Sequence, residues 1–369
     1  MIVKLGEVAR ECRNTWKESK EGVPVVGLEH LEPGEITLSA WDIDSENTFS
    51  KKFSAGQVLL GRRRVYLRKA VLAPMDGICS GDITVIEALP NKILPELLPF
   101  IIQNDAFFNY SMKGSAGSLS PRVKWEHLQD YEFALPSLSE QRVLADKLWA
   151  AYRLKESYKK LLKATDEMVK SQFIEMFKNV DQREELSNLC STFVDGDWIE
   201  SKDQSDNGVR LIQTGNVGNG VFKDKGDKAR FISSETFDRL NCTEIKAGDI
   251  LVSRLPDPVG RACIVPIGLG KCITAVDCTI IRLGDKILPE LFINFTKTPD
   301  YSIQIRKVLS GSTRLRVSRM NLGKIKVPIP PMSLQQQFVS IAEQSDKSKF
   351  ELNKSIEAID KVIKSLINN

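Results

Sequence analysis

The chain has 369 residues, 42% of them hydrophobic and 27% charged, and this balance excludes a disordered chain. No apolar run is long enough to cross a bilayer, so we expect a globular protein of about two or three domains without a membrane span. The net charge of +4 is too small to indicate nucleic-acid binding, so only local clusters of cations can support that function.

The amino terminus and the scarcity of histidine disfavour several kinds of protein. Lys4 and Glu7 stand where a signal peptide has its apolar core, so we expect a cytoplasmic protein. The seven cysteines are scattered without a Cys-x-x-Cys pair, and His30 and His127 are the only histidines. Metal sites and Ser-His-Asp catalysis therefore lack their usual residues. We expect reduced cysteines, and no catalytic residue, metal or cofactor in this chain.

The chain repeats itself with a period of about 194 residues, which is the length of whole domains rather than of solenoid repeats. The hexapeptide Lys-Ile-Leu-Pro-Glu-Leu stands at residues 92–97 and again at residues 286–291. Upstream, Ala-Gly-Gln-Val-Leu-Leu at 55–60 resembles Ala-Gly-Asp-Ile-Leu-Val at 247–252. The sequence therefore predicts two related domains that differ in their surface loops.

Both halves contain short β-branched runs bounded by Gly, Asp or Pro, which is the pattern of strands. Pro-Glu pairs suit the first turn of a helix and predict helices at 95–104 and 289–296. This mixture indicates an α+β fold with curled sheets. The predicted strands cover residues 23–27, 58–60, 83–86, 250–253 and 278–282.

A cluster of cations follows the strand at 58–60, and we call residues 62–69 and their repeat, 254–261, the basic loops. Arginine can pair with phosphates or offer two parallel donors to guanine, although a solvated basic turn would look the same. The second copy is poorer in cations, so the two domains need not contact the same bases. The candidate DNA-binding residues here are Arg62, Arg63, Arg64, Tyr66, Arg68, Lys69, Arg254 and Arg261.

Residues 113–125 and 310–319, which we call the arms, combine small residues, hydroxyls and arginines in both copies. Small residues let the backbone approach a phosphate, although ordinary turns have the same composition. The Gly117-Ser118 pair returns as Gly311-Ser312. Residues 215–220 predict a hairpin turn rather than a nucleotide loop. The further candidate DNA-binding residues are Lys113, Arg122, Lys124, Gln213, Asn216, Arg314, Arg316 and Arg319.

Each half ends with a strand, a proline and a long heptad helix, whose start Ser139 or Ser333 can cap. The two heptads share one register and are interrupted at the same place by Lys155 and Lys349. Such a seam predicts a coiled coil, although each helix could instead lie on its own domain. The predicted seam consists of Leu144, Leu148, Ala151, Tyr158, Leu162, Val169, Phe338, Ala342, Leu352, Ile356, Ile359 and Ile363.

Several catalytic motifs are absent from the sequence. It has neither a GxxxxGK[ST] loop nor the Asn-Pro-Pro-aromatic tetrapeptide of adenine methyltransferases. Glu18-Ser19-Lys20 matches the end of a nuclease motif, but so short a pattern occurs by chance. We therefore do not expect a nuclease site at this tripeptide.

A β-rich domain, a strand ending in proline and a heptad helix, all present twice, resemble the specificity subunits of type I restriction-modification enzymes. The resemblance covers essentially the whole chain. It implies two pseudo-repeated β-rich target-recognition domains, at 1–137 and 181–331. These are separated by two long antiparallel coiled-coil helices, the central spacer at 138–180 and the C-terminal spacer at 332–369. Each domain of such a subunit reads one half of a split target in double-stranded DNA.

The resemblance also implies partners that supply the chemistry. Two modification subunits would hold S-adenosylmethionine and methylate adenine, and restriction subunits would use ATP and Mg²⁺ for translocation and cleavage. A helix of 40 residues spans about 60 Å, which would leave unread bases between the two halves of the target. Two alternatives remain open at this point. They are a self-sufficient nuclease or methyltransferase with an unrecognised site, and a duplicated scaffold that binds proteins.

Overall fold

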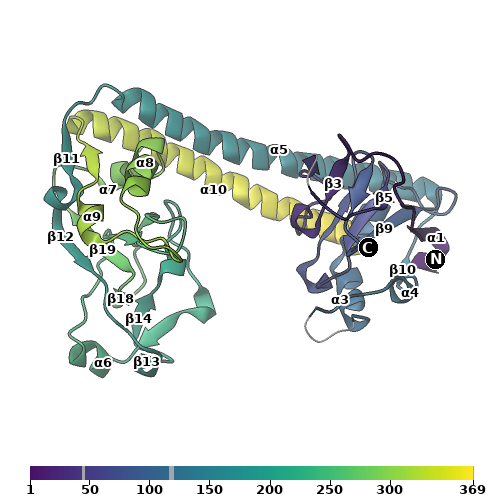
Figure 1. Ribbon diagram of the computed structural model, residues 1–369, viewed down its shortest axis with the longest axis horizontal. Helices are drawn as coiled ribbons and strands as arrows, with labels where there is room; N and C mark the ends of the chain where they lie inside the picture. Colours follow the sequence, from purple (N-terminus) through teal and green to yellow (C-terminus); the bar gives the residue numbers. More distant parts are fainter. Residues whose placement is uncertain (44–45, 116–119, 369) are drawn as a thin grey trace. The chain divides into compact units, whose positions relative to one another are not determined.

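The computed structural model describes residues 1–43, 46–115 and 120–368. It divides into two compact units, each with an α+β body (Figure 1). The first unit comprises Met1–Lys160 and Leu352–Asn369, and the second comprises Leu161–Glu351. Two long helices, α5 (Leu138–Phe177) and α10 (Met332–Asn368), contribute to both. The predicted fold class, two related α+β domains with two long helices, is confirmed.

The first unit contains two sheets of four strands and one strand pair. The order of the first sheet is β2-β9-β6-β7, and that of the second is β4-β3-β8-β5 with β3 parallel to β8. The strand pair joins β1 to β10 near the start of α5. The strands are β1 (Ile2–Lys4), β2 (Ala9–Cys12), β3 (Pro24–Val26), β4 (Asp42–Ile43), β5 (Lys51–Phe53), β6 (Val58–Gly61), β7 (Ala70–Leu72), β8 (Gly77–Cys79), β9 (Ile83–Ala88) and β10 (Glu132–Ala134).

The second unit repeats this topology. Its first sheet has the order β12-β19-β16-β17, its second β13-β15-β14-β18 with β14 parallel to β18, and β11 pairs with β20. The sequence repeat is therefore a duplication of the fold. The strands are β11 (Arg183–Glu185), β12 (Cys190–Asp195), β13 (Gln204–Ser205), β14 (Val209–Ile212), β15 (Arg230–Ile232), β16 (Ile250–Ser253), β17 (Ala262–Ile264), β18 (Cys272–Thr274), β19 (Cys278–Leu283) and β20 (Lys326–Pro328).

The central strands β6 and β16 are mainly apolar because both of their faces are buried. Along β6, Val58 and Leu60 pack into the core next to α5, whereas Leu59 points into a second core. In β16, Val252 and Leu251 divide in the same way between two cores of the second unit. Successive side chains along each of these two strands therefore point alternately into two different cores, and neither face of the strand is polar.

Short helices cover one core of each unit. The predicted helix at 289–296 matches α7, but the one predicted at 95–104 is shorter, since residues 95–97 form turns and α2 begins at Leu98. Asn104 then starts the next helix, because its side chain accepts a hydrogen bond from Ala106 N. The short helices are α1 (Leu5–Val8), α2 (Leu98–Ile102), α3 (Asp105–Lys113), α4 (Trp125–Leu128), α6 (Ser234–Arg239), α7 (Pro289–Thr296), α8 (Pro299–Lys307) and α9 (Arg319–Gly323).

A buried glutamine joins the repeated hexapeptide to the long helix. In the first unit, Gln141 of α5 is 1% exposed, and its Oε1 accepts a hydrogen bond from Leu94 N at 2.9 Å. Its Nε2 donates to the carbonyls of Lys92 and Pro136, at 3.4 and 3.0 Å. One buried side chain thus satisfies three backbone groups.

The second unit has the same joint, built by Gln335 of α10. Its Oε1 accepts from Leu288 N at 3.0 Å, and its Nε2 donates to the carbonyls of Lys286 and Pro330, each at 2.9 Å. The hexapeptide is therefore part of the joint between each α+β body and its helix. The glutamine makes the same three hydrogen bonds in both copies, to equivalent backbone groups.

The expected helix caps are wrong. Ser139 lies inside the first turn of α5, because this helix already begins at Leu138. Ser137 precedes the helix, and its N–H donates to Oε2 of Glu140 at 2.9 Å. Ser333 likewise lies inside the first turn of α10.

The two polar interruptions of the heptads form equivalent ion pairs. In the first unit, Lys155 Nζ lies 2.6 Å from Oδ1 of Asp360. In the second, Lys349 Nζ lies 2.7 Å from Oδ1 of Asp166. Each pair joins α5 to α10. In the sequence repeat, Lys349 corresponds to Lys155, and Asp360 corresponds to Asp166. Every predicted seam residue is buried or half-buried, and these are Leu144, Leu148, Ala151, Tyr158, Leu162, Val169, Phe338, Ala342, Leu352, Ile356, Ile359 and Ile363.

The helices run antiparallel within the second unit. Phe173 and Phe177, near the end of α5, pack their rings against Phe338 near the start of α10, with centroid distances of 5.2 and 5.6 Å. Asp166, earlier in α5, pairs with Lys349, which lies later in α10. Later residues of α5 thus contact earlier residues of α10, so the two helices run in opposite directions here.

Reversing one charge of the Lys155–Asp360 pair is expected to destabilise the first unit, and reversing both should restore it. We expect Lys155→Asp to lower the free energy of unfolding by about 2 kcal/mol, because two carboxylates would then face each other in a partly buried seam. Adding Asp360→Lys should recover at least half of this loss. Urea unfolding measures both values, and Lys160→Asp, on the exposed face of α5, is the control. Equal stabilities of the single and double variants would contradict a pairing role.

Candidate nucleic-acid interface

The basic loop and the arm meet in both units. In the first unit, Arg64 N donates to the carbonyl of Pro121 at 2.8 Å, and Val123 N donates to that of Arg62 at 3.0 Å. In the second, Val317 N donates to the carbonyl of Arg254 at 3.3 Å. Two cationic segments that lie far apart in the sequence therefore form one surface, and they do so twice.

A carboxylate organises the cations of the first unit. Asp82, just before β9, accepts two hydrogen bonds from Arg122, at 2.7 and 3.2 Å, and lies 3.7 Å from Nη1 of Arg63. The hydrogen bond from Arg122 is the main reason why the pKa of Asp82 is lowered. Arg122 remains exposed, so this paired guanidinium is held in place while still facing solvent.

The first basic loop has an unusual backbone. Arg64 and Arg68 have φ of 52° and 54°, in the left-handed region, on either side of the short 3-10 turn Val65–Leu67. Holding a residue other than glycine there costs about 1 kcal/mol or more, so the surrounding contacts must impose it. The turn buries Val65 and leaves Tyr66 52% exposed. This backbone therefore presents Arg64 and Tyr66 to solvent.

Other cations of this loop are used within the unit. Arg68 pairs with Asp105 at the start of α3, and Lys69 Nζ donates to the carbonyl of Leu28 at 2.6 Å. Half-buried Arg62 contributes backbone contacts that anchor the loop to Asp82 and to the arm. Arg68 and Lys69 thus have partners within the unit, and Arg62 supports the loop through its backbone.

The arm of the first unit adds two exposed lysines. Lys113 ends α3 and Lys124 precedes α4. Gly117 and Ser118, which the sequence predicted as a phosphate-approaching pair, lie outside the described residues.

The second basic loop is mainly structural, which corrects the prediction that Arg254 and Arg261 contact DNA. Half-buried Arg254 donates to the carbonyl of Val276 at 2.5 Å and lies 3.4 Å from Oδ1 of Asp195. The guanidinium of Arg261 donates hydrogen bonds to acceptors of its own unit from all three of its nitrogens. It therefore has no free N–H edge to offer a base. Its acceptors are the carbonyls of Thr214, Val217, Pro256 and Pro258, and Oγ of Ser253.

Asn216 also has a structural role, which corrects its prediction as a base-reading amide. The residue is 5% exposed; its Oδ1 accepts from Gln213 N at 3.0 Å, and its Nδ2 donates to the carbonyl of Lys223 at 2.8 Å. The oxygen and the NH2 group of this amide are therefore both already hydrogen-bonded within the turn. Half-buried Gln213 uses only its backbone in this turn, so its side chain stays a candidate.

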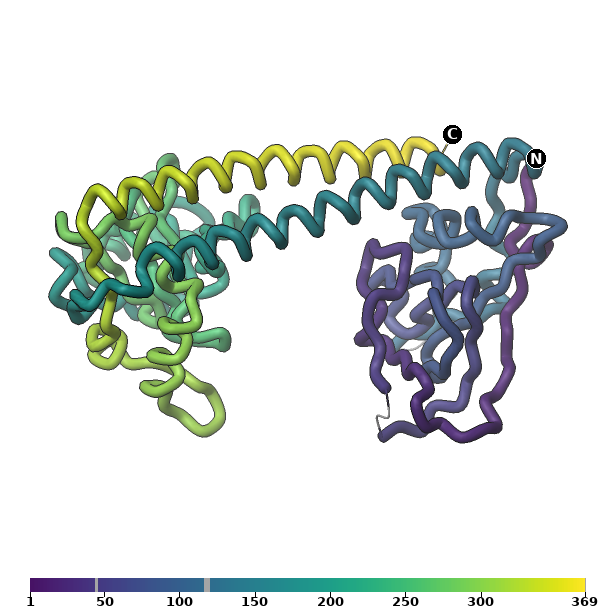
Figure 2. Tube along the Cα trace, turned by 90° about the horizontal axis from the view of Figure 1, so that it is seen from above, coloured from purple at the N-terminus to yellow at the C-terminus, as the bar shows by residue number. Residues whose placement is uncertain are grey.

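The free cations of the second unit lie on its arm. Ser310 and Arg316 exchange two backbone hydrogen bonds of 2.9 Å around Gly311, whose φ of 102° suits only glycine. Arg314 and Arg316 are exposed on this hairpin, the light green loop that projects from the second unit in Figure 2. Arg319 follows at the start of α9, 3.9 Å from Oδ2 of Asp195.

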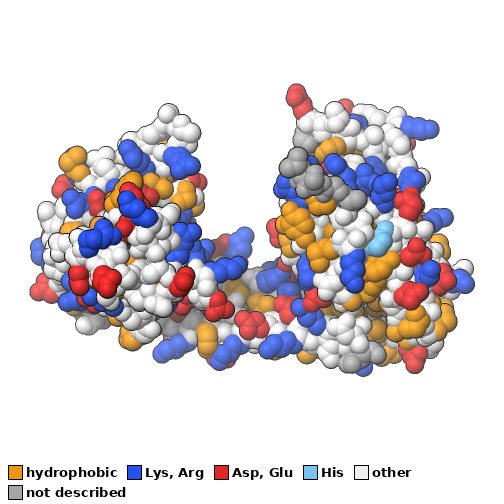
Figure 3. Space-filling view, turned by 90° about the horizontal axis from the view of Figure 1, so that it is seen from below, with side chains coloured by type: hydrophobic (Ala, Val, Ile, Leu, Met, Phe, Trp, Pro, Cys, Tyr) orange, Lys and Arg blue, Asp and Glu red, His pale blue; other side chains and the backbone are white. Residues whose placement is uncertain are grey.

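Asp82 and Asp195, the carboxylates that lie beside these arginines, could not be identified from the sequence. An aspartate beside a strand is too common a pattern to indicate such a role. On the face shown in Figure 3, Lys and Arg side chains gather on both units, with Asp and Glu among them. The face shown is therefore mixed in charge on both units, without a large excess of positive charge.

Other kinds of site find no support in the described part of the chain. Among residues 1–43, 46–115 and 120–368, no helix is long and apolar enough to span a membrane. Across the same ranges, no group of three His, Cys, Asp or Glu residues could hold a metal ion. The seven cysteines are free thiols.

Comparisons with known proteins agree with this duplicated architecture. Residues 182–360 match the model of the type I restriction modification DNA specificity domain. The type I restriction enzyme MjaVIII specificity subunit of Methanocaldococcus jannaschii is 22% identical over 341 residues, which cover 85% of this chain and 75% of that subunit.

Two solved structures share the fold. One is a chain from work on complex assembly and conformational transition of the type I R-M system, with a TM-score of 0.58, 18% identity and coverage of 100% of this chain and 96% of that chain. The other is a type I restriction-modification S subunit from M. genitalium, with a TM-score of 0.54, 12% identity and coverage of 100% and 95%. Residues 182–360 of this chain thus match a type I restriction modification DNA specificity domain, and the whole chain shares its duplicated fold with a type I restriction-modification S subunit.

Proposed function

We propose that this chain recognises a bipartite sequence in double-stranded DNA and directs adenine methylation and restriction by partner subunits. The observation that carries the proposal is the joining of basic loop and arm in both units, which gives each unit one organised cationic surface. Phosphate contacts position a protein on DNA, and contacts to base edges supply specificity. Each unit would use its surface for one half of the target.

Both units have exposed cations that could contact DNA. Arg64, Arg122 and Lys124 of the first unit, and Arg314 and Arg316 of the second, are exposed and suit phosphates or guanine edges. The two surfaces differ in sequence, since the first combines cations of its basic loop and its arm and the second relies on its arm. The two halves of the target would therefore differ, which gives an asymmetric recognition sequence.

The chemistry would belong to the partners. Two modification subunits would bind the long helices, hold S-adenosylmethionine and methylate an adenine that leaves the base stack. Restriction subunits would add ATP-driven translocation and Mg²⁺-dependent cleavage. This chain would hold no cofactor of its own and would act in the cytoplasm as a non-catalytic subunit.

Replacing residues 1–136 with those of a relative is expected to change one half of the methylated sequence and leave the other half unchanged. The reason is that the cationic surface of each unit is built from that unit alone. The chain is first co-purified with its neighbouring modification subunit, and methylated adenines are then mapped in cells with and without it. A change in both halves would contradict the modular proposal.

Simple controls separate the two alternatives. The purified chain, incubated with DNA and either Mg²⁺ or a methyl donor, should show no turnover, whereas turnover would identify a self-sufficient enzyme. Binding of DNA that weakens steeply with salt would exclude a scaffold that binds only proteins.

A further inference from the structure

A longer repeat surrounds the tripeptide Glu18-Ser19-Lys20. The loop after β2 reads Trp-Lys-Glu-Ser-Lys from Trp16, and the loop after β12 reads Trp-Ile-Glu-Ser-Lys from Trp198. Neither loop belongs to a group of three possible metal-binding residues in the described ranges. A tryptophan, a carboxylate and a lysine thus stand at the same spacing in both units.

Trp198 is 70% exposed, more than any other of the five tryptophans. An indole is the largest apolar side chain, and leaving it in water forgoes much of the stabilisation that its burial could supply. Trp16 of the first unit is half-buried instead, because it packs against the cluster of Val23, Val25 and Ile78, and the ammonium of Lys52 lies 5.3 Å from its ring centroid. The first ring therefore has a cationic partner within its own unit.

The loop that carries Trp198 is firmly built. Glu200 N donates to Oδ2 of Asp203 at 3.1 Å, and the other carboxylate oxygen of Asp203 accepts from Arg239 at 2.6 Å. The ammonium of Lys202 lies 2.8 Å from Oε2 of Glu200. A hydrogen bond from Lys202 is the main cause of the lowered pKa of Glu200, and one from the indole of Trp198 adds to it. The loop that carries the exposed Trp198 is thus braced by hydrogen bonds and an ion pair of its own residues.

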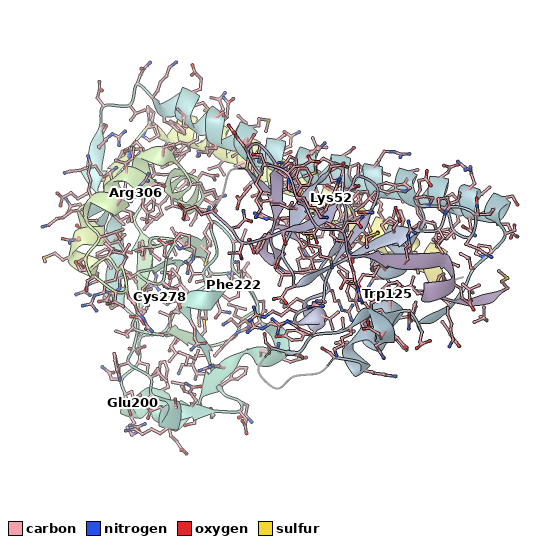
Figure 4. All side chains as sticks on the ribbon, turned by 45° about the vertical axis from the view of Figure 1, so that its right-hand side comes forward. Lys52, Trp125, Glu200, Phe222, Cys278 and Arg306 are labelled. Atoms are coloured by element: carbon pink, nitrogen blue, oxygen red, sulfur yellow. The ribbon has the colours of Figure 1, made fainter. Side chains whose placement is uncertain are left out.

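The loop is continuous with the cationic surface of the second unit. Asp195, three residues before Trp198, lies beside Arg254 and Arg319. Asp197 N donates to the carbonyl of Thr274 at 2.8 Å, which fixes this segment to β18. Figure 4 shows Glu200 and Arg306 at opposite ends of the second unit, so the loop lies away from α8.

We infer that Trp198 contacts DNA directly, its indole packing against sugars and base faces while Lys202 pairs with a neighbouring phosphate. The inference rests on the proposed function and extends the interface of the second unit beyond its arm. Aromatic rings suit this task because every nucleotide offers apolar sugar and base faces, and a rigid side chain loses little freedom on binding.

The test uses the complex with the modification subunits and a duplex that contains the methylated motif. We expect Trp198→Ala to weaken binding about tenfold, Trp198→Phe to retain most of the affinity, and the slope of affinity against salt to stay unchanged because no charge is lost. Lys202→Ala should instead lower that slope by about one phosphate contact. Ile267, 92% exposed in the same unit, gives the matched control Ile267→Ala, which should bind like the wild type.

Fluorescence adds a measurement that does not depend on the alanine variant. The difference in emission between the wild type and Trp198→Phe reports on Trp198, and the duplex should shield it from acrylamide. Equal affinities of the wild type and Trp198→Ala, or equal losses in Trp198→Ala and Ile267→Ala, would overturn the inference. A wild-type complex that binds no DNA would instead reject the proposed function itself.

Discussion

Arg261→Ala is expected to destabilise the second unit by about 3 kcal/mol, whereas Arg314→Ala should leave its stability unchanged and weaken DNA binding. The guanidinium of Arg261 satisfies four backbone carbonyls and the hydroxyl of Ser253. Removing it leaves several of these acceptors without a partner in a half-buried site, and each such loss is costly. Arg314, by contrast, stands exposed on the arm and supports no backbone.

The two variants separate stability from recognition. Hydrogen exchange of the residues around the basic loop measures local opening in Arg261→Ala, and thermal unfolding measures the loss in the whole unit. Binding of the target duplex by the complex measures the effect of Arg314→Ala. Normal exchange protection in Arg261→Ala together with weaker DNA binding would mean that Arg261 contacts DNA after all.

Gln335→Ala is expected to loosen the joint between α10 and the second α+β body, at a cost of about 3 kcal/mol. Gln335 is 1% exposed, and the substitution leaves Leu288 N and the carbonyls of Lys286 and Pro330 without these partners. Gln337, on the exposed face of the same helix, provides the control, and Gln337→Ala should change stability by less than about 0.5 kcal/mol.

The joint also affects recognition, because the position of each α+β body on its helix sets where its cationic surface lies. We expect Gln335→Ala to reduce methylation at the target while the first unit keeps its own stability. Urea unfolding gives the first quantity, and sequencing of methylated adenines gives the second. If Gln335→Ala and Gln337→Ala were equally stable, the glutamine would not hold the joint.

The duplication, the α+β class and the two heptad helices could all be predicted from the sequence. These features follow from local signals: a repeated hexapeptide, β-branched runs bounded by turn residues, and an apolar period of 3.5 residues. The sequence marks Lys155 and Lys349 as polar interruptions of the two heptads, and the structure gives each of them an aspartate partner on the other helix. The partners could not be chosen from sequence, because both helices carry many exposed charges.

The candidate interface was less predictable, since the same residue types serve both DNA contact and internal support. Arg64 and Arg314 are exposed, whereas Arg261 and Asn216 are bonded to carbonyls from other parts of the chain. Composition and spacing determine where cations cluster along the chain. Whether a given guanidinium faces solvent or the backbone depends on which carbonyls and carboxylates the folded sheets bring within hydrogen-bonding distance. Long-range contacts set those distances, and no local pattern records them.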